Sequence, residues 1–267
     1  MEKLIITTVQ TDLHWENKVD NLEMLGTKIM GIKEKTNVVV LPEMFSTGFT
    51  MQPEMMAEKM DGETVSWMRN IACEKGIILA GSLGIEEDGE YYNRFVWMLP
   101  NGQHGTYDKR HCFSLGGENE HYAPGNKRTI ASVGGWRINL QICYDLRFPV
   151  WARQQPFADP EKDPSPEYDL MINVANWPER RSHHWKTLLQ ARAIENQCYV
   201  VGVNRVGSDG NGLYHSGDSM VIDPLGQILY HQSNEEDIHT TILEKSQLEE
   251  VRTRLPFWKD GDHFLLV

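Results

Sequence analysis

The sequence predicts an α/β fold in which packed sheets form a single domain spanning residues 1–267. Strand-like and helix-like segments alternate along this chain, which is long enough to bury a sizeable core. The two halves repeat the alternation without any linker between them, which favours one domain over two. The alternation alone fits both a two-sheet sandwich and a doubly wound sheet.

The first half opens with a strand at residues 4–10 and continues with a helix at 16–35. The helix is predicted from apolar residues that recur every three or four positions, namely Val19, Leu22, Leu25, Ile29 and Ile32. The β-branched run at 37–43 is typical of a strand buried on both faces. The remaining elements of this half are expected to be a helix at 64–75, strands at 76–82 and 93–99, a turn at 100–102 and a strand that ends near Lys109.

The second half repeats the pattern. Its predicted elements are a strand at 136–143, a short helix at 148–155, a strand at 169–176, a helix at 182–198, a strand at 199–206, and a β-meander over 219–232 and 240–244 with a turn at 223–226. One segment does not fit this alternation of strands and helices. Residues 154–167 contain four prolines, several acidic residues and no apolar periodicity, so we expect an exposed, mobile loop there.

Composition excludes several classes of protein. The net charge is −12, and such an acidic surface repels phosphate backbones and anionic membranes, so neither nucleic acid nor a membrane is an expected partner. No stretch approaches the roughly 18 apolar residues of a spanning helix. The first residues lack the basic and apolar regions of a signal peptide, which predicts a cytoplasmic location.

The four cysteines are Cys73, Cys112, Cys143 and Cys198, and no two of them lie close together in the sequence. A structural zinc site needs close ligand pairs, so no metal is expected. Disulfides are not expected in a reducing cytosol. Because buried cysteines usually behave as small hydrophobic residues, we expect three of the four to be structural.

Three segments bring reactive groups to strand ends. The strand at 136–143 ends in Cys143, the strand at 37–43 ends in Glu43, and Lys109 follows a further strand. A thiolate can attack a carbonyl, a carboxylate can move protons, and an ammonium can stabilise an oxyanion. Each residue also has an inert interpretation, as a core cysteine, a solvated glutamate and a surface lysine. The residues that flank each of the three are therefore needed to choose between the catalytic and the inert interpretation.

Those flanking residues closely resemble the nitrilase, or carbon–nitrogen hydrolase, superfamily. The resemblance is carried by Leu-Pro-Glu at 41–43, Tyr-Asp-Lys at 107–109 and Cys-Tyr-Asp-Leu-Arg-Phe-Pro at 143–149, in the superfamily's Glu-Lys-Cys order. It implies a four-layer α-β-β-α sandwich and catalysis without a metal or organic cofactor. It also implies a homodimer or a larger homo-oligomer.

The resemblance assigns a role to each residue of the site. Cys143 is the expected nucleophile on an elbow, Glu43 the general base, and Lys109 the oxyanion ligand together with the backbone N–H of Tyr144. The neighbouring Arg110 is less suited than Lys109 because its charge is spread over a planar fork. Glu118 aligns with a second glutamate of the superfamily that keeps the lysine charged, and Glu120 is the competing alignment.

The expected pocket wall begins at Asn176-Trp177-Pro178, where the superfamily has a substrate-facing loop. For Trp177, simple core packing remains an equal alternative. Arg147 is expected to be a structural ion-pair partner near the elbow. On the helix at 182–198, Arg192, Glu195 and Asn196 continue an apolar stripe, and we interpret them as structural.

Within the superfamily, the chain most resembles the ω-amidase group. The matching segments are residues 143–151, 174–178, 191–197 and 204–207. They imply release of ammonia from the terminal amide of a small carboxylic acid monoamide, such as the 2-oxo acid amide 2-oxoglutaramate, through a cysteine thioester. The alternatives are a related hydrolase of nitriles, N-carbamoyl compounds or other amides, and an inactive binding module.

An anionic substrate poses a problem for a protein of net charge −12. Its carboxylate needs a local cationic or hydrogen-bonding clamp within the pocket. The basic residues just after Trp177 offer one, and Arg181 or Arg180 is our candidate. The alternative is that both arginines only flank the next helix at its solvent face.

Overall fold

The computed structural model describes residues 1–156, 164–262 and 264. Two sheets form its centre. The first sheet, in the order β13-β1-β2-β3-β4-β5, contains β1 (Lys3–Gln10), β2 (Val38–Val40), β3 (Ile78–Glu87), β4 (Glu90–Met98), β5 (His104–Asp108) and β13 (Asp237–Glu244). The second, in the order β10-β11-β9-β8-β7-β6 with β12 on β11, contains β6 (Ile130–Val133), β7 (Trp136–Ile142), β8 (Leu170–Ala175), β9 (Tyr199–Asn204), β10 (Val206–Ser208), β11 (Tyr214–Ile222) and β12 (Ile228–Ser233).

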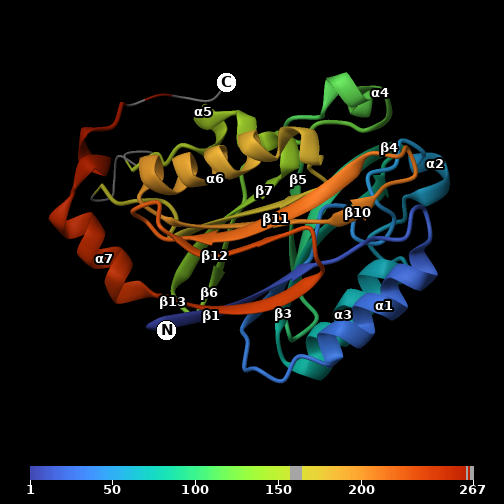
Figure 1. Cartoon of the computed structure of the whole chain (residues 1–267), viewed down its shortest axis with the longest axis horizontal. Helices are drawn as coiled ribbons and strands as arrows, with labels where there is room; N and C mark the ends of the chain where they lie inside the picture. Colours follow the sequence, from blue (N-terminus) through green and yellow to red (C-terminus); the bar gives the residue numbers. More distant parts are fainter. Residues whose placement is uncertain (157–163, 263, 265–267) are drawn as a thin grey trace.

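The three longest helices among the described residues, α1, α3 and α6, lie on the outer faces of these sheets (Figure 1). The α-helices are α1 (Lys18–Met30), α2 (Pro53–Met56), α3 (Glu63–Lys75), α4 (Glu118–His121), α5 (Pro149–Ala152), α6 (Ser182–Asn196) and α7 (Lys245–Arg254). The described residues also form short 3₁₀ turns, namely η1 (Ser114–Gly116), η2 (Cys143–Arg147), η3 (Glu179–Arg181) and η4 (Phe257–Asp260). None of the helices in the described ranges is long and apolar enough to cross a membrane.

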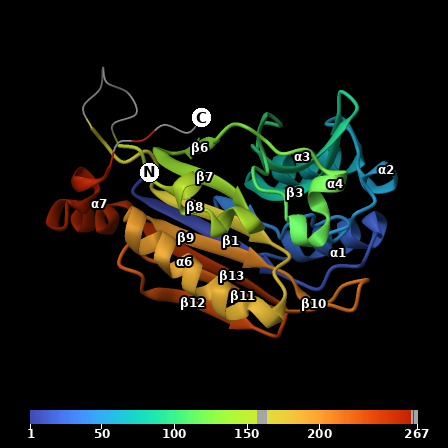
Figure 2. The ribbon, with the colours of Figure 1, turned by 90° about the horizontal axis from the view of Figure 1, so that it is seen from above.

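Three apolar clusters establish the order of the layers. One lies between the two sheets, where Val38 and Val40 of β2 belong to the same cluster as Ile138 of β7. A second joins the other face of the first sheet to α1 and α3, and a third joins the second sheet to α6. Figure 2 shows α6 and the α1–α3 pair on opposite sides of the sheets. The predicted α-β-β-α sandwich is therefore confirmed.

Strand β2 illustrates why the sheets pack in this way. All three valines are fully buried: Val38 and Val40 face the second sheet, and Val39 faces the helices. The first helix is shorter than predicted at both ends. Asn17 caps its start by accepting a hydrogen bond from the backbone N–H of Asp20, and the helix already ends at Met30, with Gly31 as the C-cap. Val19, which contributed to the predicted apolar stripe, is 63% exposed.

The C-terminal segment differs from the prediction in two ways. β13 is not part of a meander with β11 and β12, because it pairs antiparallel with β1 and completes the first sheet. Helix α7 was not predicted. Its sequence is polar, and the helix buries only Leu248 and Val251, so the apolar periodicity is too weak to predict a helix.

The expected exposed loop at 154–167 is described only at its ends, and residues 157–163 lie outside the described ranges. Gln154 is buried, contrary to the prediction. Its Nε2 donates hydrogen bonds to the carbonyl oxygens of Tyr168 and Asn196. At the other end Glu167 accepts a hydrogen bond from Arg128 at 3.1 Å. The described ends of the segment are thus tied to the domain.

Candidate active site

The candidate active site forms where strand ends of the two sheets meet. Glu43 follows β2 and Lys109 follows β5 in the first sheet, while Cys143 follows β7 and Asn176 follows β8 in the second. β7 and β8 are parallel and adjacent, so their carboxyl ends lie side by side. The inter-sheet packing brings these four residues together at one end of the sandwich.

Cys143 occupies a sharp turn from strand to 3₁₀ helix. Its φ is +43°, a left-handed conformation that a non-glycine residue rarely adopts. The turn is held by Asp145, whose Oδ2 accepts a hydrogen bond from the backbone N–H of Ile142 at 3.1 Å. This geometry is that of a nucleophile elbow, in which a strained turn thrusts a reactive side chain into a cleft.

Beneath the cysteine, Lys109 bridges two carboxylates. Its Nζ lies 2.9 Å from Glu43 Oε1 and 2.8 Å from Glu118 Oε2, and all three side chains are at most 1% exposed. Glu120, the competing alignment for the second glutamate, is exposed on α4. The structure therefore brings Glu118, and not Glu120, to the lysine.

Two asparagines complete the surroundings of Glu43. Asn93 of β4 donates Nδ2 to Glu43 Oε1 at 2.8 Å and to Glu118 Oε1 at 3.2 Å. The backbone N–H of Asn176 donates to Glu43 Oε2 at 2.8 Å. Asn93 was missed in the sequence analysis, although a polar residue at the start of the predicted strand 93–99, just before its apolar run, is the signal that could have found it.

The charges of this cluster act on one another. Burial alone would lower the pKa of Lys109, but the carboxylates of Glu118 and Glu43 raise that pKa well above its usual value. Burial raises the pKa of Glu118, against the effect of Lys109. Burial and the Glu43 charge also raise the pKa of the Cys143 thiol well above its ordinary range. The lysine is thus held as a cation and the resting cysteine as a neutral thiol.

A second network braces the elbow against the lysine segment. Asp145 accepts hydrogen bonds from the Tyr107 hydroxyl at 2.7 Å and from the backbone N–H of His111 at 3.0 Å. Tyr107 and His111 flank Lys109 in the sequence, and Asp145 lies two residues after Cys143. One buried carboxylate therefore fixes the nucleophile turn relative to the lysine, a link between sheets that the sequence did not reveal.

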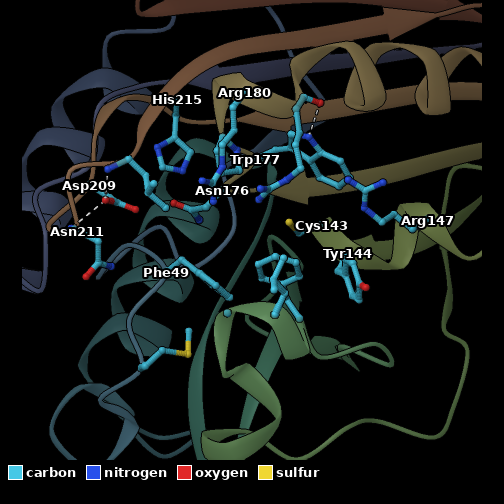
Figure 3. A pocket seen from close by; sticks show the side chains of 17 residues that line it. Phe49, Cys143, Tyr144, Arg147, Asn176, Trp177, Arg180, Asp209, Asn211 and His215 are labelled. Atoms are coloured by element: carbon cyan, nitrogen blue, oxygen red, sulfur yellow. Dashed lines mark hydrogen bonds between the residues drawn. The ribbon is translucent and has the colours of Figure 1, made fainter.

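Above the cysteine lies a cavity of about 250 Å³. Phe49, Phe113 and Trp177 form aromatic parts of its wall, and Tyr144 and Asn176 also line it. Figure 3 shows Cys143 between Tyr144 and Arg147 on one side and His215, Asp209 and Asn211 on the other. The predicted substrate-facing residues thus do line one pocket with the nucleophile.

Three arginines give part of this wall a positive charge: Arg147, Arg180 and Arg181. Burial, followed by the neighbouring charges of Arg180 and Arg147, lowers the pKa of Arg181. Arg181 is half-buried with its guanidinium 5.4 Å from the centre of the Phe113 ring, whereas Arg180 is exposed. Crowded cations of this kind favour an anion between them.

Arg147 differs from its prediction as a structural ion-pair partner. No carboxylate within the described residues pairs with it. Instead its guanidinium lies 4.7 Å from the centre of the Trp177 ring, and it contacts His184 Nδ1 at 3.2 Å. Trp177 is itself 3% exposed, and the centre of its ring lies 5.5 Å from the centre of the Trp185 ring. Trp177 therefore belongs to both the core and the pocket wall. By contrast, Arg192 does pair inside the protein, with Glu195 at 2.9 Å.

The other cysteines lie in three environments. Cys198 is buried, Cys112 is partly buried and Cys73 is exposed, so Cys73 is not the core residue that the sequence suggested. Within the described ranges, no group of three or more His, Cys, Asp or Glu side chains could hold a metal ion.

The sequence of the chain matches the carbon–nitrogen hydrolase family over residues 5–253. The chain belongs to this family. It is 43% identical to omega-amidase YafV of Escherichia coli (strain K12) over 100% of both chains. It is 31% identical to 2-oxoglutaramate amidase of Bacillus subtilis (strain 168) over 97% of both chains.

A solved member of the family has nearly the same structure. The carbon–nitrogen hydrolase superfamily protein of Xanthomonas campestris, crystallised with an arsenic adduct in its active site, is 42% identical over 100% of both chains, with a TM-score of 0.96. These similarities confirm the predicted family, its fold class and the prediction of a hydrolase that acts on amides.

Proposed function

We propose that the protein is an ω-amidase that releases ammonia from the terminal amide of a small carboxylic acid monoamide, with 2-oxoglutaramate as the representative substrate. The observation that carries this proposal is the lining of the cavity, where the Cys143 thiol shares one small pocket with Arg147, Arg180 and Arg181. The names of the Escherichia coli and Bacillus subtilis relatives point to the same substrate class.

In the first half of the proposed reaction, a Glu43 carboxylate oxygen takes the thiol proton of Cys143, and the sulfur attacks the amide carbon. Because the resting thiol has a raised pKa, this proton transfer has to accompany attack. The tetrahedral oxyanion is stabilised by Lys109 and the backbone N–H of Tyr144. Glu43 then returns the proton to the amide nitrogen, the C–N bond breaks, ammonia leaves and a thioester remains on Cys143.

In the second half, Glu43 removes a proton from water, and the hydroxide attacks the thioester carbon. Lys109 and Tyr144 again stabilise the oxyanion, and the C–S bond breaks to release the acid and restore the thiol. Glu118 keeps Lys109 charged throughout, which its 2.8 Å contact supports. No cofactor takes part in these steps.

The proposed carboxylate clamp is Arg181, with Arg147 beside it. A bound carboxylate would relieve the crowding of positive charge that lowers the pKa of Arg181. Arg180 is the weaker candidate because its side chain is exposed. Trp177 and Asn176 would form the adjoining wall of the substrate site.

The test is an ammonia-release assay with four substrates: 2-oxoglutaramate, succinamate, a short nitrile and an N-carbamoyl amino acid. We expect the highest kcat/KM for 2-oxoglutaramate. Preference for the nitrile or the N-carbamoyl compound would replace this function by that of another carbon–nitrogen hydrolase. Absence of turnover with all four, together with absence of iodoacetamide labelling at Cys143, would identify a binding module.

We also propose that the protein forms one domain and works in the cytoplasm as a homodimer or larger homo-oligomer. The pairing of the C-terminal β13 with the N-terminal β1 supports a single domain. A catalytic thiol that has to stay reduced supports a reducing compartment. Sedimentation velocity of the purified protein measures the assembly state, and a monomer at micromolar concentration would contradict the oligomer.

A further inference from the structure

His215 lines the pocket but has no part in the steps described above. It is the second residue of β11, where it pairs with Gly207 of β10, so the strand ladder and not the connecting loop sets its position. Its side chain is on the opposite side of Cys143 from Arg147 (Figure 3). Only 2% of the residue is exposed.

The hydrogen bonding of this imidazole is incomplete. Nδ1 is fully buried and makes no hydrogen bond of normal geometry in the part of the chain that the structure describes, although the backbone of Gly207 and Leu213 lies near the ring. Buried polar groups are nearly always paired, so an imidazole with so few partners beside a pocket needs a functional reason. A ring that served only to fill space could have been a phenylalanine at no such cost.

His215 is also uncharged at neutral pH. Burial, and then the nearby guanidinium of Arg205, lowers its pKa to about 4. The carboxylate of Asp209 and the backbone of Gly207 and Leu213 act in the opposite direction. A neutral imidazole offers one N–H donor and one acceptor and no charge. It is therefore suited to an uncharged polar group of the substrate and not to its carboxylate.

We propose that His215 determines specificity by donating a hydrogen bond to the 2-oxo oxygen of the substrate. This inference rests on the proposed ω-amidase function and deepens it. The substrate has two polar groups besides its amide, and the pocket has two kinds of partner for them. The carboxylate matches the guanidinium groups of the wall, and the uncharged 2-oxo oxygen matches the neutral imidazole. Selection of 2-oxo acid amides over simple acid amides follows.

The experiment compares 2-oxoglutaramate with glutaramate, which has the same chain and terminal amide but no 2-oxo group. We expect the unaltered enzyme to prefer 2-oxoglutaramate in kcat/KM by roughly tenfold or more, as for one hydrogen bond to a buried group. His215→Phe should lose most of this preference, with little change on glutaramate. His239→Phe is the matched control, because His239 stacks on Tyr230 at 3.9 Å and does not line the pocket.

Equal loss on both amides in His215→Phe, or no preference in the unaltered enzyme, would overturn the role of His215 while leaving the ω-amidase function intact. Failure of the unaltered enzyme to hydrolyse either amide would overturn both. If His215→Phe does not fold, product inhibition of the unaltered enzyme provides the test of 2-oxo recognition. The inference then requires 2-oxoglutarate to inhibit at roughly tenfold lower concentration than glutarate, and equal inhibition contradicts it.

Discussion

The buried charge cluster and the pocket wall are built on different principles. In the cluster, Glu43, Lys109 and Glu118 are at most 1% exposed and lie within 2.9 Å of a charged partner. In the wall, Arg147 and Arg181 are half-buried and rest on the faces of Trp177 and Phe113. The first region resembles a closed ionic network, and the second leaves its cations available to a ligand.

This difference separates the chemistry from the choice of substrate. Charges in the cluster are paired and desolvated, so removing the lysine would leave two carboxylates buried without a cation, at a cost of about 3–5 kcal/mol. Charges in the wall are half-buried or exposed and lie beside the cavity, so removing one costs the fold less and mainly affects what the pocket binds. Substitutions in the two regions should therefore have different signatures.

The largest effect is expected at the nucleophile. Cys143→Ala should abolish ammonia release, because no other nucleophile among the described residues lies on the elbow and only positioning remains. Steady-state assay of the purified variant measures this, and circular dichroism checks that it folds. Residual activity within about tenfold of the parent, or about 1.4 kcal/mol of barrier, would remove Cys143 from the mechanism.

The two glutamates of α4 form a matched pair within the comparison. Glu118→Gln should reduce kcat strongly and also lower the unfolding free energy by about 1.5–3 kcal/mol, the value of a charged hydrogen bond, because Lys109 then keeps only Glu43 as a charged partner. Glu120→Gln, at an exposed position two residues away, should change neither. Urea unfolding and steady-state kinetics on both variants measure the two effects. Similar behaviour of the two variants would contradict the assignment of Glu118.

His215 provides a pH-dependent measurement on the wall. Its folded pKa of about 4 lies below the unfolded value of 6.5, so the unfolded state binds more protons between these values. Its contribution to stability is complete above pH 6.5 and falls by about 3 kcal/mol as the pH drops to 4. Urea unfolding at pH 7 and pH 4.5 should show a smaller loss for His215→Phe than for the parent. Identical losses would mean that the histidine is not buried as a neutral group.

The smallest and most selective effect is expected at Arg181. Arg181→Ala should lower kcat/KM for 2-oxoglutaramate by an amount that corresponds to about 1.5–3 kcal/mol of lost transition-state stabilisation, the value of a charged hydrogen bond. The kcat/KM for an uncharged short amide such as propionamide should not change. Arg180→Ala, at the more exposed neighbour, should have a weaker effect on 2-oxoglutaramate and none on propionamide. An equal loss of kcat/KM for the two amides, or no loss for either, would show that Arg181 does not bind the carboxylate and only flanks α6.

The same division explains what the sequence could predict. Lys109 and Cys143 directly follow a strand and Glu43 lies three residues beyond one, so a local pattern together with the family resemblance was enough to select them. Asn93 and the Asp145 brace depend on how the two sheets pack, which no local pattern records. Arg147 was misjudged because its partner is the face of Trp177, and the position of that ring depends on packing against α6.

The described ends of the 154–167 segment show the same limit. Proline and acidic content predicted exposure, but Gln154 is buried because its amide pairs with the carbonyl oxygens of Tyr168 and Asn196. Likewise β13 was expected to extend a local hairpin, and instead it pairs with β1 from the other end of the chain. Contacts between distant segments decided both outcomes.

The central claim is that the amide is cleaved through an acyl group on the Cys143 sulfur. Acid quenching during steady-state turnover of 2-oxoglutaramate, followed by peptide mass spectrometry, tests it most directly. The account predicts an acyl adduct on the peptide that contains Cys143, absent in Cys143→Ala, and removable by hydroxylamine as expected of a thioester. Continued ammonia release with an unmodified Cys143 peptide, or an adduct on Cys73, Cys112 or Cys198, would contradict it.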